Sequence, residues 1–196
     1  MRLVLCSGSP RRREMLERLG IAFEVEVPRV AEARRPGERI LEYPERLARE
    51  KAAAGLESWR KRGGQGPAVA LAADTVVVFG EEVLEKPRDR ADAERMLRKL
   101  SAADHRVITG VCVAGDGFAR SRIVVTGVRF ADLQPSVLRW LAASGDGDDK
   151  AGAYAVQGLA GAFVERIDGS FSNVVGLPLL ETIALLEAAG VGMPWT

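Results

Sequence analysis

The sequence predicts a mixed α/β fold, in which one β-sheet is flanked by helices. Three observations carry this prediction. Apolar, strand-like runs alternate along the chain with stretches of helical spacing. The apolar run over 68–79 is typical of a central strand buried on both faces. Two later strand patterns are joined by the turn residues Asp116-Gly117, and such a hairpin makes the sheet mixed rather than purely parallel.

The N-terminal part of the chain contains the clearest local signals. A short apolar strand is predicted over 3–6, followed by a helix with Ser9 as its N-cap and Pro10 in its first turn. Gly20 ends this helix. Alternation of apolar and acidic residues over 23–27 then predicts a second strand.

The next stretch is charged and contains a Pro-Gly pair, which predicts a mobile surface loop over 30–42. A helix is expected over 44–56 and a loop over 62–67. The remaining predicted elements are the strand at 68–79, a turn into a short strand at 83–84, a helix capped by Asp89, strands at 107–114, 123–130 and 162–167, a glycine-rich acidic loop at 145–161, and helices through 137–141 and 177–189.

Composition limits the classes of function. The chain has 196 residues, enough for one substantial core, and we expect a single domain over 1–196. A formal net charge of +1 argues against binding a nucleic-acid polymer or a membrane surface. No apolar run approaches the roughly 20 residues that span a bilayer, and no signal peptide is evident. Cys6 and Cys112 offer neither a disulfide framework nor metal-ligand spacing, so we expect a cytoplasmic location.

The strongest chemical signal is the cluster of Arg11, Arg12 and Arg13 directly after Ser9, at a strand-to-helix turn. Free N–H groups and the helix dipole attract anions at a helix start, and the arginine fork suits phosphate. The alternative is a solvated helix face. Because this end of a helix disfavours cations, the cluster indicates a bound anion.

Asp74 is the second signal, because it lies inside an apolar run where a carboxylate needs a partner, a proton or a metal. The alternative is a strand edge, or a carboxylate that accepts backbone hydrogen bonds. Lys86, which ends the short strand, is by itself typical of a solvated strand end. His105 has no metal-binding neighbour, which favours a structural or surface role, and the acidic residues after Gly145 favour a solvated loop.

Over essentially its full length, the chain resembles the Maf family of nucleotide pyrophosphatases. The order and spacing of several blocks carry the resemblance. The matching blocks are Ser7-Gly8-Ser9-Pro10-Arg11-Arg12, Arg46-Leu47-Ala48-Arg49-Glu50-Lys51-Ala52, Ala73-Asp74-Thr75, Leu84-Glu85-Lys86-Pro87, Met96-Leu97-Arg98-Lys99-Leu100-Ser101, Asp149-Lys150-Ala151-Gly152-Ala153-Tyr154, Gln157-Gly158 and Val174-Val175-Gly176-Leu177-Pro178.

This resemblance implies an elongated mixed α/β fold with two lobes around a central cleft, shared distantly with inosine triphosphate pyrophosphatases. It implies a homodimeric enzyme that uses a divalent cation, Mg²⁺ or alternatively Mn²⁺. By matching position, Asp74 is the proton acceptor and a candidate metal ligand, and Glu32 lies where the family has an acidic residue near the metal. The positions that match nucleotide-contacting residues are Ser9, Arg11, Arg12, Lys51, Thr75, Lys86 and Gln157.

Within the family, the resemblance is to the subgroup that hydrolyses dTTP and UTP to the monophosphate and pyrophosphate, which limits incorporation of unwanted nucleotides. The residues that favour this subgroup are Arg11, Thr75 and Gln157. Two alternatives stay open here. One is a pyrophosphatase for 7-methyl-GTP or other modified nucleotides, and the other is a non-catalytic regulator of cell division. A regulator would not need Asp74 together with the cationic set.

Overall fold

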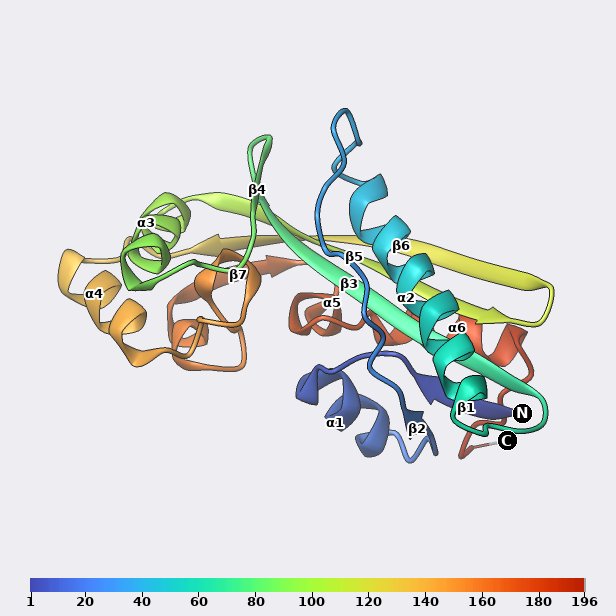
Figure 1. The fold of residues 1–196 in the computed structure, drawn as a ribbon. Coiled ribbons are helices and arrows are strands. Elements are labelled where there is room, and N and C mark those ends of the chain that lie inside the picture. Colours follow the sequence, from blue (N-terminus) through green and yellow to red (C-terminus); the bar gives the residue numbers. More distant parts are fainter. Residues whose placement is uncertain (196) are drawn as a thin grey trace. The chain divides into compact units, whose positions relative to one another are not determined.

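The computed structural model of the chain describes residues 1–195, which form two compact units (Figure 1). The first unit comprises residues 1–74, 109–124 and the C-terminal segment from Gly176. The second comprises residues 75–108 and 125–175. Three strands contribute residues to both units, and the single domain over 1–196 stays a prediction.

Within the described residues, seven strands form a mixed sheet in the order β2-β1-β3-β5-β6-β7, with β4 also paired to β3. β1 pairs in parallel with β2 and β3, whereas β4 is antiparallel to β3, and β7 is antiparallel to β6. The predicted mixed α/β class is therefore confirmed. The strands are β1 Arg2–Leu5, β2 Glu24–Val25, β3 Ala68–Phe79, β4 Glu82–Leu84, β5 Asp104–Gly115, β6 Phe118–Phe130 and β7 Val164–Asp168.

The helices follow the predicted order with local differences. They are α1 Pro10–Arg18, α2 Glu42–Lys61, α3 Arg90–Leu100, α4 Pro135–Ser144, α5 Phe171–Val175 and α6 Leu179–Ala188, with short 3₁₀ helices η1 Ala151–Ala153 and η2 Leu159–Phe163. The predicted cap of α3 is confirmed, because the Asp89 carboxylate accepts from the Asp92 N–H at 2.8 Å. The strand expected over 23–27 was too long, and η2 delays the start of β7 to Val164. The sequence pattern did not indicate α5.

In the first unit, alternate strand residues face opposite sides of the sheet, and the core therefore has two layers. Odd-numbered residues of β1, β3 and β5 pack with α1 and α6, and even-numbered residues pack with α2. Both faces of these strands are thus covered, as the apolar run of β3 predicted. The odd-numbered members are Leu3, Leu5, Val69, Leu71, Ala73, Val111 and Val113; the even-numbered ones are Val4, Ala68, Ala70, Ala72, Cys112 and Ala114, joined by Cys6 directly after β1.

The face under α2 is built from small residues, which lets the helix approach the sheet closely. A Cβ on Gly55 of α2 would lie 2.2 Å from the Cys6 sulfur, and one on Gly110 of β5 would lie 2.5 Å from the Glu45 backbone nitrogen. Both thiols are free and buried, and burial raises the pKa of Cys6 to about 12 and of Cys112 to about 11. This agrees with the expectation that neither cysteine forms a disulfide.

In the second unit, α3 packs against α4 and η1 around a core that contains Phe130 and Tyr154. His105 is fully buried in this layer, and its Nε2 lies 2.8 Å from the Tyr154 hydroxyl. Its ring stacks on Phe130 at a centroid distance of 5.6 Å. Burial lowers the pKa of His105 to about 4, so the imidazole is neutral at pH 7. The structural role expected for His105 is the one that the structure gives it.

None of the helices within residues 1–195 is long and apolar enough to cross a membrane.

Candidate active site

Asp74 lies at the end of the β3 segment that belongs to the first unit, on the even-numbered face beneath α2. Only 7% of the residue is exposed, so its carboxylate needs a partner. The partner is a lysine, because Oδ1 accepts from the Lys51 Nζ at 2.7 Å. An ion pair therefore compensates the buried charge.

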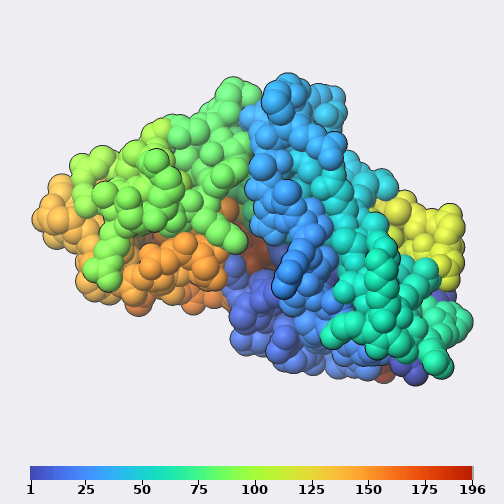
Figure 2. All heavy atoms as spheres, in the orientation of Figure 1, coloured from blue at the N-terminus to red at the C-terminus, as the bar shows by residue number. Residues whose placement is uncertain are grey.

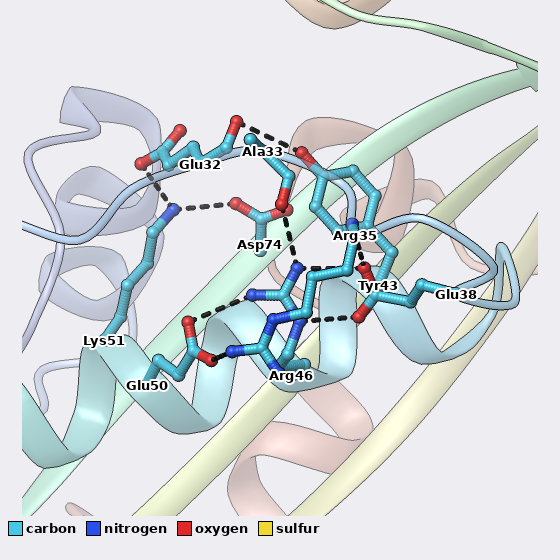
Figure 3. A network of polar contacts seen from close by, with 9 residues as sticks. All are labelled: Glu32, Ala33, Arg35, Glu38, Tyr43, Arg46, Glu50, Lys51 and Asp74. Atoms are coloured by element: carbon cyan, nitrogen blue, oxygen red, sulfur yellow. Dashed lines mark hydrogen bonds and ion pairs between the residues drawn. The ribbon is translucent and has the colours of Figure 1, made fainter.

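Lys51 reaches this carboxylate from α2. It belongs to the buried face of the helix, together with Leu47 and Gly55 at helical spacing. Besides Asp74, its ammonium group contacts the Glu32 Oε1 at 2.7 Å (Figure 3). One buried cation thus joins two carboxylates, and this group of three side chains has a net charge of −1.

Glu32 lies on the segment 28–41, which has neither helix nor regular strand and precedes α2. Figure 2 shows this segment and α2, blue to cyan, at the surface of the first unit. The Glu32 side chain is 49% exposed, whereas the Asp74 side chain is 11% exposed. Tyr43 donates to the Glu32 carbonyl at 3.3 Å. The two carboxylates therefore share one lysine but differ in access to solvent.

Arg12 supplies a second cation from the start of α1. Its Nε donates to the Gly176 carbonyl at 2.7 Å, and its Nη1 donates to the Ser7 hydroxyl at 3.2 Å. Burial lowers the pKa of the Arg12 guanidinium, while the charges of Asp74 and Glu32 raise it. Because both carboxylates affect the pKa of Arg12, its guanidinium lies within electrostatic range of Asp74 and of Glu32.

Ser9 and Arg11 surround Arg12 at the same helix start. Ser9 is the N-cap residue of α1, as predicted, but its side chain makes no capping hydrogen bond. Its N–H instead donates to the Ser7 hydroxyl at 3.2 Å. Arg11 is half-buried, and its charge contributes to lowering the pKa of Arg12. Two adjacent guanidinium groups at a helix N-terminus form an electropositive site suited to an anion.

The other predicted residues belong to the second unit. Thr75 follows Asp74 on β3 and is half-buried, while Lys86 and Gln157 are exposed. The Gly152 N–H donates to the Glu85 carbonyl at 3.1 Å, which joins the segment before Lys86 to η1. Gln157 follows in the same glycine-rich loop, where Asp146 accepts from the Leu159 N–H at 3.0 Å. The sequence predicted a solvated loop here, and the Asp146 carboxylate also braces this loop through its contact with Leu159.

Three residues that make contacts in the site were not predicted as such from the sequence. Ser7 accepts from both Arg12 and the Ser9 N–H, Gly176 offers its carbonyl to Arg12, and Tyr43 anchors the backbone of Glu32. Ser7 could have been found, because it lies in the same short motif as Ser9. A backbone carbonyl 164 residues away carries no signal of this kind.

The residues of the first unit supply some, but not all, of the ligands that a divalent cation needs. Within residues 1–195 there is no cluster of three or more histidine, cysteine or acidic side chains that could enclose a metal. However, Glu32 and Asp74 already direct one oxygen each at a shared cation, the Lys51 ammonium. Mg²⁺ in nucleotide sites is commonly held by one or two carboxylates, water and substrate phosphates, so this donor set is compatible with it.

Comparison with known proteins places this geometry in context. The family model described as Maf-like protein matches residues 2–189. A dTTP/UTP pyrophosphatase of Anaeromyxobacter sp. (strain Fw109-5) is 51% identical over 199 residues, with 99% of this chain and 92% of the relative covered.

Relatives from other bacteria have the same description, and the match again covers more than nine-tenths of each chain. A dTTP/UTP pyrophosphatase of Vibrio cholerae is 50% identical over 186 residues, covering 95% of this chain and 97% of the relative. One of Escherichia coli O157:H7 is 48% identical over 185 residues, covering 94% of this chain and 91% of the relative. The similarity therefore extends over nearly the whole of this chain and of each relative.

Proposed function

The chain belongs to the Maf family, and we propose that it is a nucleoside triphosphate pyrophosphatase that hydrolyses dTTP and UTP to the monophosphate and pyrophosphate. The full-length relatives described as dTTP/UTP pyrophosphatases support this substrate class. The observation that carries the proposal is the buried ion pair between Lys51 and Asp74, extended by Glu32 and accompanied by Arg12.

This arrangement suits hydrolysis of a phosphoanhydride. The oxygen of a water molecule forms a bond to the α-phosphorus, the bond to the bridging oxygen breaks, and pyrophosphate leaves. The reaction requires neutralisation of phosphate charge more than covalent help from the protein. Arg12 and Lys51 supply positive charge in the first unit, and Asp74 supplies a carboxylate that can accept the proton of the attacking water.

We also propose that Glu32 and Asp74 hold Mg²⁺, with Mn²⁺ as the alternative ion. A bound divalent cation supplies neutralisation of phosphate charge and acidification of water. With the ion bound, Asp74 is either its ligand or the base. In both roles, Lys51 orients the Asp74 carboxylate through their contact at 2.7 Å.

The remaining predicted residues are proposed to bind the nucleotide. Ser9, Arg11 and Lys86 provide donors for phosphate oxygens, and the exposed position of Lys86 leaves its ammonium accessible. Thr75 and Gln157 provide hydrogen bonds to the edge of the pyrimidine. A site built to pair these polar groups rejects bases that leave them without a partner.

The decisive test is a panel of nucleoside triphosphates, incubated with and without Mg²⁺, with pyrophosphate and orthophosphate measured separately. We expect Mg²⁺-dependent release of pyrophosphate from dTTP and UTP. Release of single orthophosphate, or no turnover of any triphosphate, would contradict the proposal. Preference for 7-methyl-GTP or another modified nucleotide would instead select the alternative pyrophosphatase.

Base selectivity has its own test at Gln157. We expect Gln157→Ala to lower kcat/KM for dTTP and UTP by about one to two decades more than for CTP or 7-methyl-GTP, as a lost polar pairing of roughly 1–3 kcal/mol predicts. Kinetics of the variant and the wild type on these four nucleotides provide the comparison. An equal loss on all four would show that Gln157 does not contact the base.

A cytoplasmic location, a homodimer and a role in limiting unwanted nucleotides complete the proposal. The cysteine content supports the first, and the family resemblance supports the other two. Sedimentation velocity of the purified protein tests the dimer. The alternative, a non-catalytic regulator of cell division, does not account for a lysine buried between two carboxylates.

A further inference from the structure

Arg46 on α2 uses two nitrogens of its guanidinium group to hold the segment 28–41 (Figure 3). Its Nε contacts the Glu38 Oε1 at 2.5 Å, and its Nη2 donates to the Glu38 Oε2 at 2.9 Å. The same Nη2 donates to the Ala33 carbonyl at 3.0 Å, and Nη1 donates to the Glu50 Oε2 at 3.0 Å. One side chain therefore ties two points of the segment to the helix.

These contacts lie at Glu32 itself and just after it along the chain. Ala33, whose carbonyl Arg46 binds, is the next residue, and the carbonyl of Glu32 itself accepts from Tyr43. Further along, the Arg35 side chain donates to Glu50 at 2.8 Å, and its N–H donates to Glu38 at 2.9 Å. Because 28–41 has neither helix nor regular strand, these side-chain contacts from α2 determine where Glu32 lies.

The Arg46–Glu38 pair has the features of a strong ion pair. It is bidentate, and its side chains are only 16% and 9% exposed. Exposed single pairs contribute little to stability, whereas bidentate pairs with little solvent access are stronger and geometrically specific. Hydrogen bonding to Arg46 also holds the pKa of Glu38 at about 2, so the pair stays ionised over the range in which the protein would act.

We propose that Arg46 is a positioning residue, which presents the Glu32 carboxylate to Lys51 and to the divalent cation by clamping the segment 28–41 to α2. The inference rests on the proposed function of Glu32 as a metal ligand. Arg46 does not touch the substrate in this role. Its removal should weaken metal binding through Glu32 and leave Lys51 and Asp74 paired.

Hydrogen exchange tests the clamp without any catalytic assay. In Arg46→Gln, we expect faster amide exchange over 28–41 by about tenfold or more, with β3 unchanged, because the segment loses its ties to α2. Arg49→Gln is the matched control. Arg49 lies on the same helix, is 45% exposed and contacts Glu45 at 3.5 Å and the Ala119 carbonyl at 3.4 Å. Unchanged exchange in Arg46→Gln, or equal acceleration in Arg49→Gln, would overturn the clamp.

Magnesium titration of dTTP hydrolysis tests the consequence for the site. Loss of a residue that orients a metal ligand typically costs about 10- to 100-fold in metal affinity or activity. We expect Arg46→Gln to raise the Mg²⁺ concentration for half-maximal rate within this range, with a smaller effect on kcat at saturating Mg²⁺, and Arg49→Gln to match the wild type. Glu38→Gln should reproduce the effect in weaker form.

A double-mutant cycle with Glu32→Gln separates positioning from general destabilisation. If Arg46 acts through Glu32, Arg46→Gln has little further effect on Mg²⁺ dependence when Glu32→Gln is already present. Full additivity of the two losses would overturn the proposal.

If the wild type hydrolyses no triphosphate, the proposed function fails while the hydrogen-exchange result still decides the clamp. If Glu32→Gln alone leaves Mg²⁺ dependence unchanged, the metal role of Glu32 fails, and so does the positioning role of Arg46.

Discussion

The two units each bury a polar pair, and the pairs differ in charge and in access to solvent. In the first unit, Lys51 and Asp74 form an ion pair at 2.7 Å, and the half-exposed Glu32 adds a second carboxylate. In the second unit, His105 and Tyr154 form a neutral pair at 2.8 Å, enclosed with Phe130 in an apolar layer. Burial lowers the pKa of His105 and raises that of Tyr154, so both groups are kept in their neutral forms.

The difference shows which buried polar groups are suited to chemistry. In the neutral pair, the His105 Nε2 and the Tyr154 hydroxyl are partners of each other, and neither group carries a charge that a ligand would have to compensate. The charged group has an excess negative charge and a carboxylate that reaches solvent, and a bound cation can compensate this excess. We therefore expect substitutions in the first pair to affect activity and those in the second to affect stability.

The largest expected effect is on catalysis at Asp74. Asp74→Asn retains the shape and can still accept from Lys51, so the protein should stay folded. Loss of the base or metal ligand should lower kcat by about 10² to 10⁴. Steady-state kinetics together with thermal unfolding measure both properties. Near-normal turnover with unchanged metal dependence would make Asp74 a structural residue, like His105.

The second prediction concerns acid stability and His105. Because the pKa of His105 in the folded state, about 4, is below its ordinary value of 6.5, the unfolded chain binds the proton more readily between these values. Its contribution to stability is therefore complete above pH 6.5 and is lost as pH falls toward 4. The loss amounts to about 3 kcal/mol.

Urea unfolding between pH 7 and pH 4 measures this dependence. The double variant His105→Phe/Tyr154→Phe, which removes the titrating group without leaving a hydroxyl unpaired, should lack most of the slope. The stability that the Glu38–Arg46 ion pair contributes is lost at lower pH than that of His105, because the pKa of Glu38 in the folded state is about 2. An equal slope in the double variant would show that His105 is not the titrating group.

The third prediction removes the cation from the charged pair. Lys51→Met leaves two carboxylates facing each other, and breaking a buried pair costs about 3–5 kcal/mol. Because Glu32 is half-exposed, we expect a smaller loss of about 2 kcal/mol in metal-free buffer at pH 7. Added Mg²⁺ should recover part of it. Lys61→Met, which breaks an exposed pair with Glu57 on the same helix, serves as the control and should show neither effect.

The smallest expected effect is at Tyr154. Tyr154→Phe removes one hydroxyl from a neutral hydrogen bond and keeps the aromatic packing against Phe130, so stability should fall by about 1 kcal/mol. Because burial, rather than this hydrogen bond, is the main cause of the low pKa of His105, the pH dependence should persist. Pyrophosphatase activity at pH 7 should match that of the wild type. A large loss of activity would contradict the division between the two pairs.

Residues that are neighbours in the sequence were sufficient to predict the local elements. The apolar run of β3, the Asp89 cap of α3 and the hairpin at Asp116-Gly117 depend on neighbouring residues, and each was predicted correctly. Elements whose bounds depend on distant partners were predicted less well. Only two residues of β2 pair with β1, and the five-residue helix α5 is too short to show a helical period.

The apolar neighbours of Asp74 in the sequence also indicated a carboxylate that needs a partner. Which partner it has depends on how distant segments pack. The pleat of β3 directs Asp74 to the face that α2 covers, and the small residues on that face let α2 approach closely enough for Lys51 to reach it. Glu32 joins the pair because α2 holds its otherwise irregular segment through Arg46. Such contacts depend on how strand and helix pack, and the spacing of residues along the chain does not encode them.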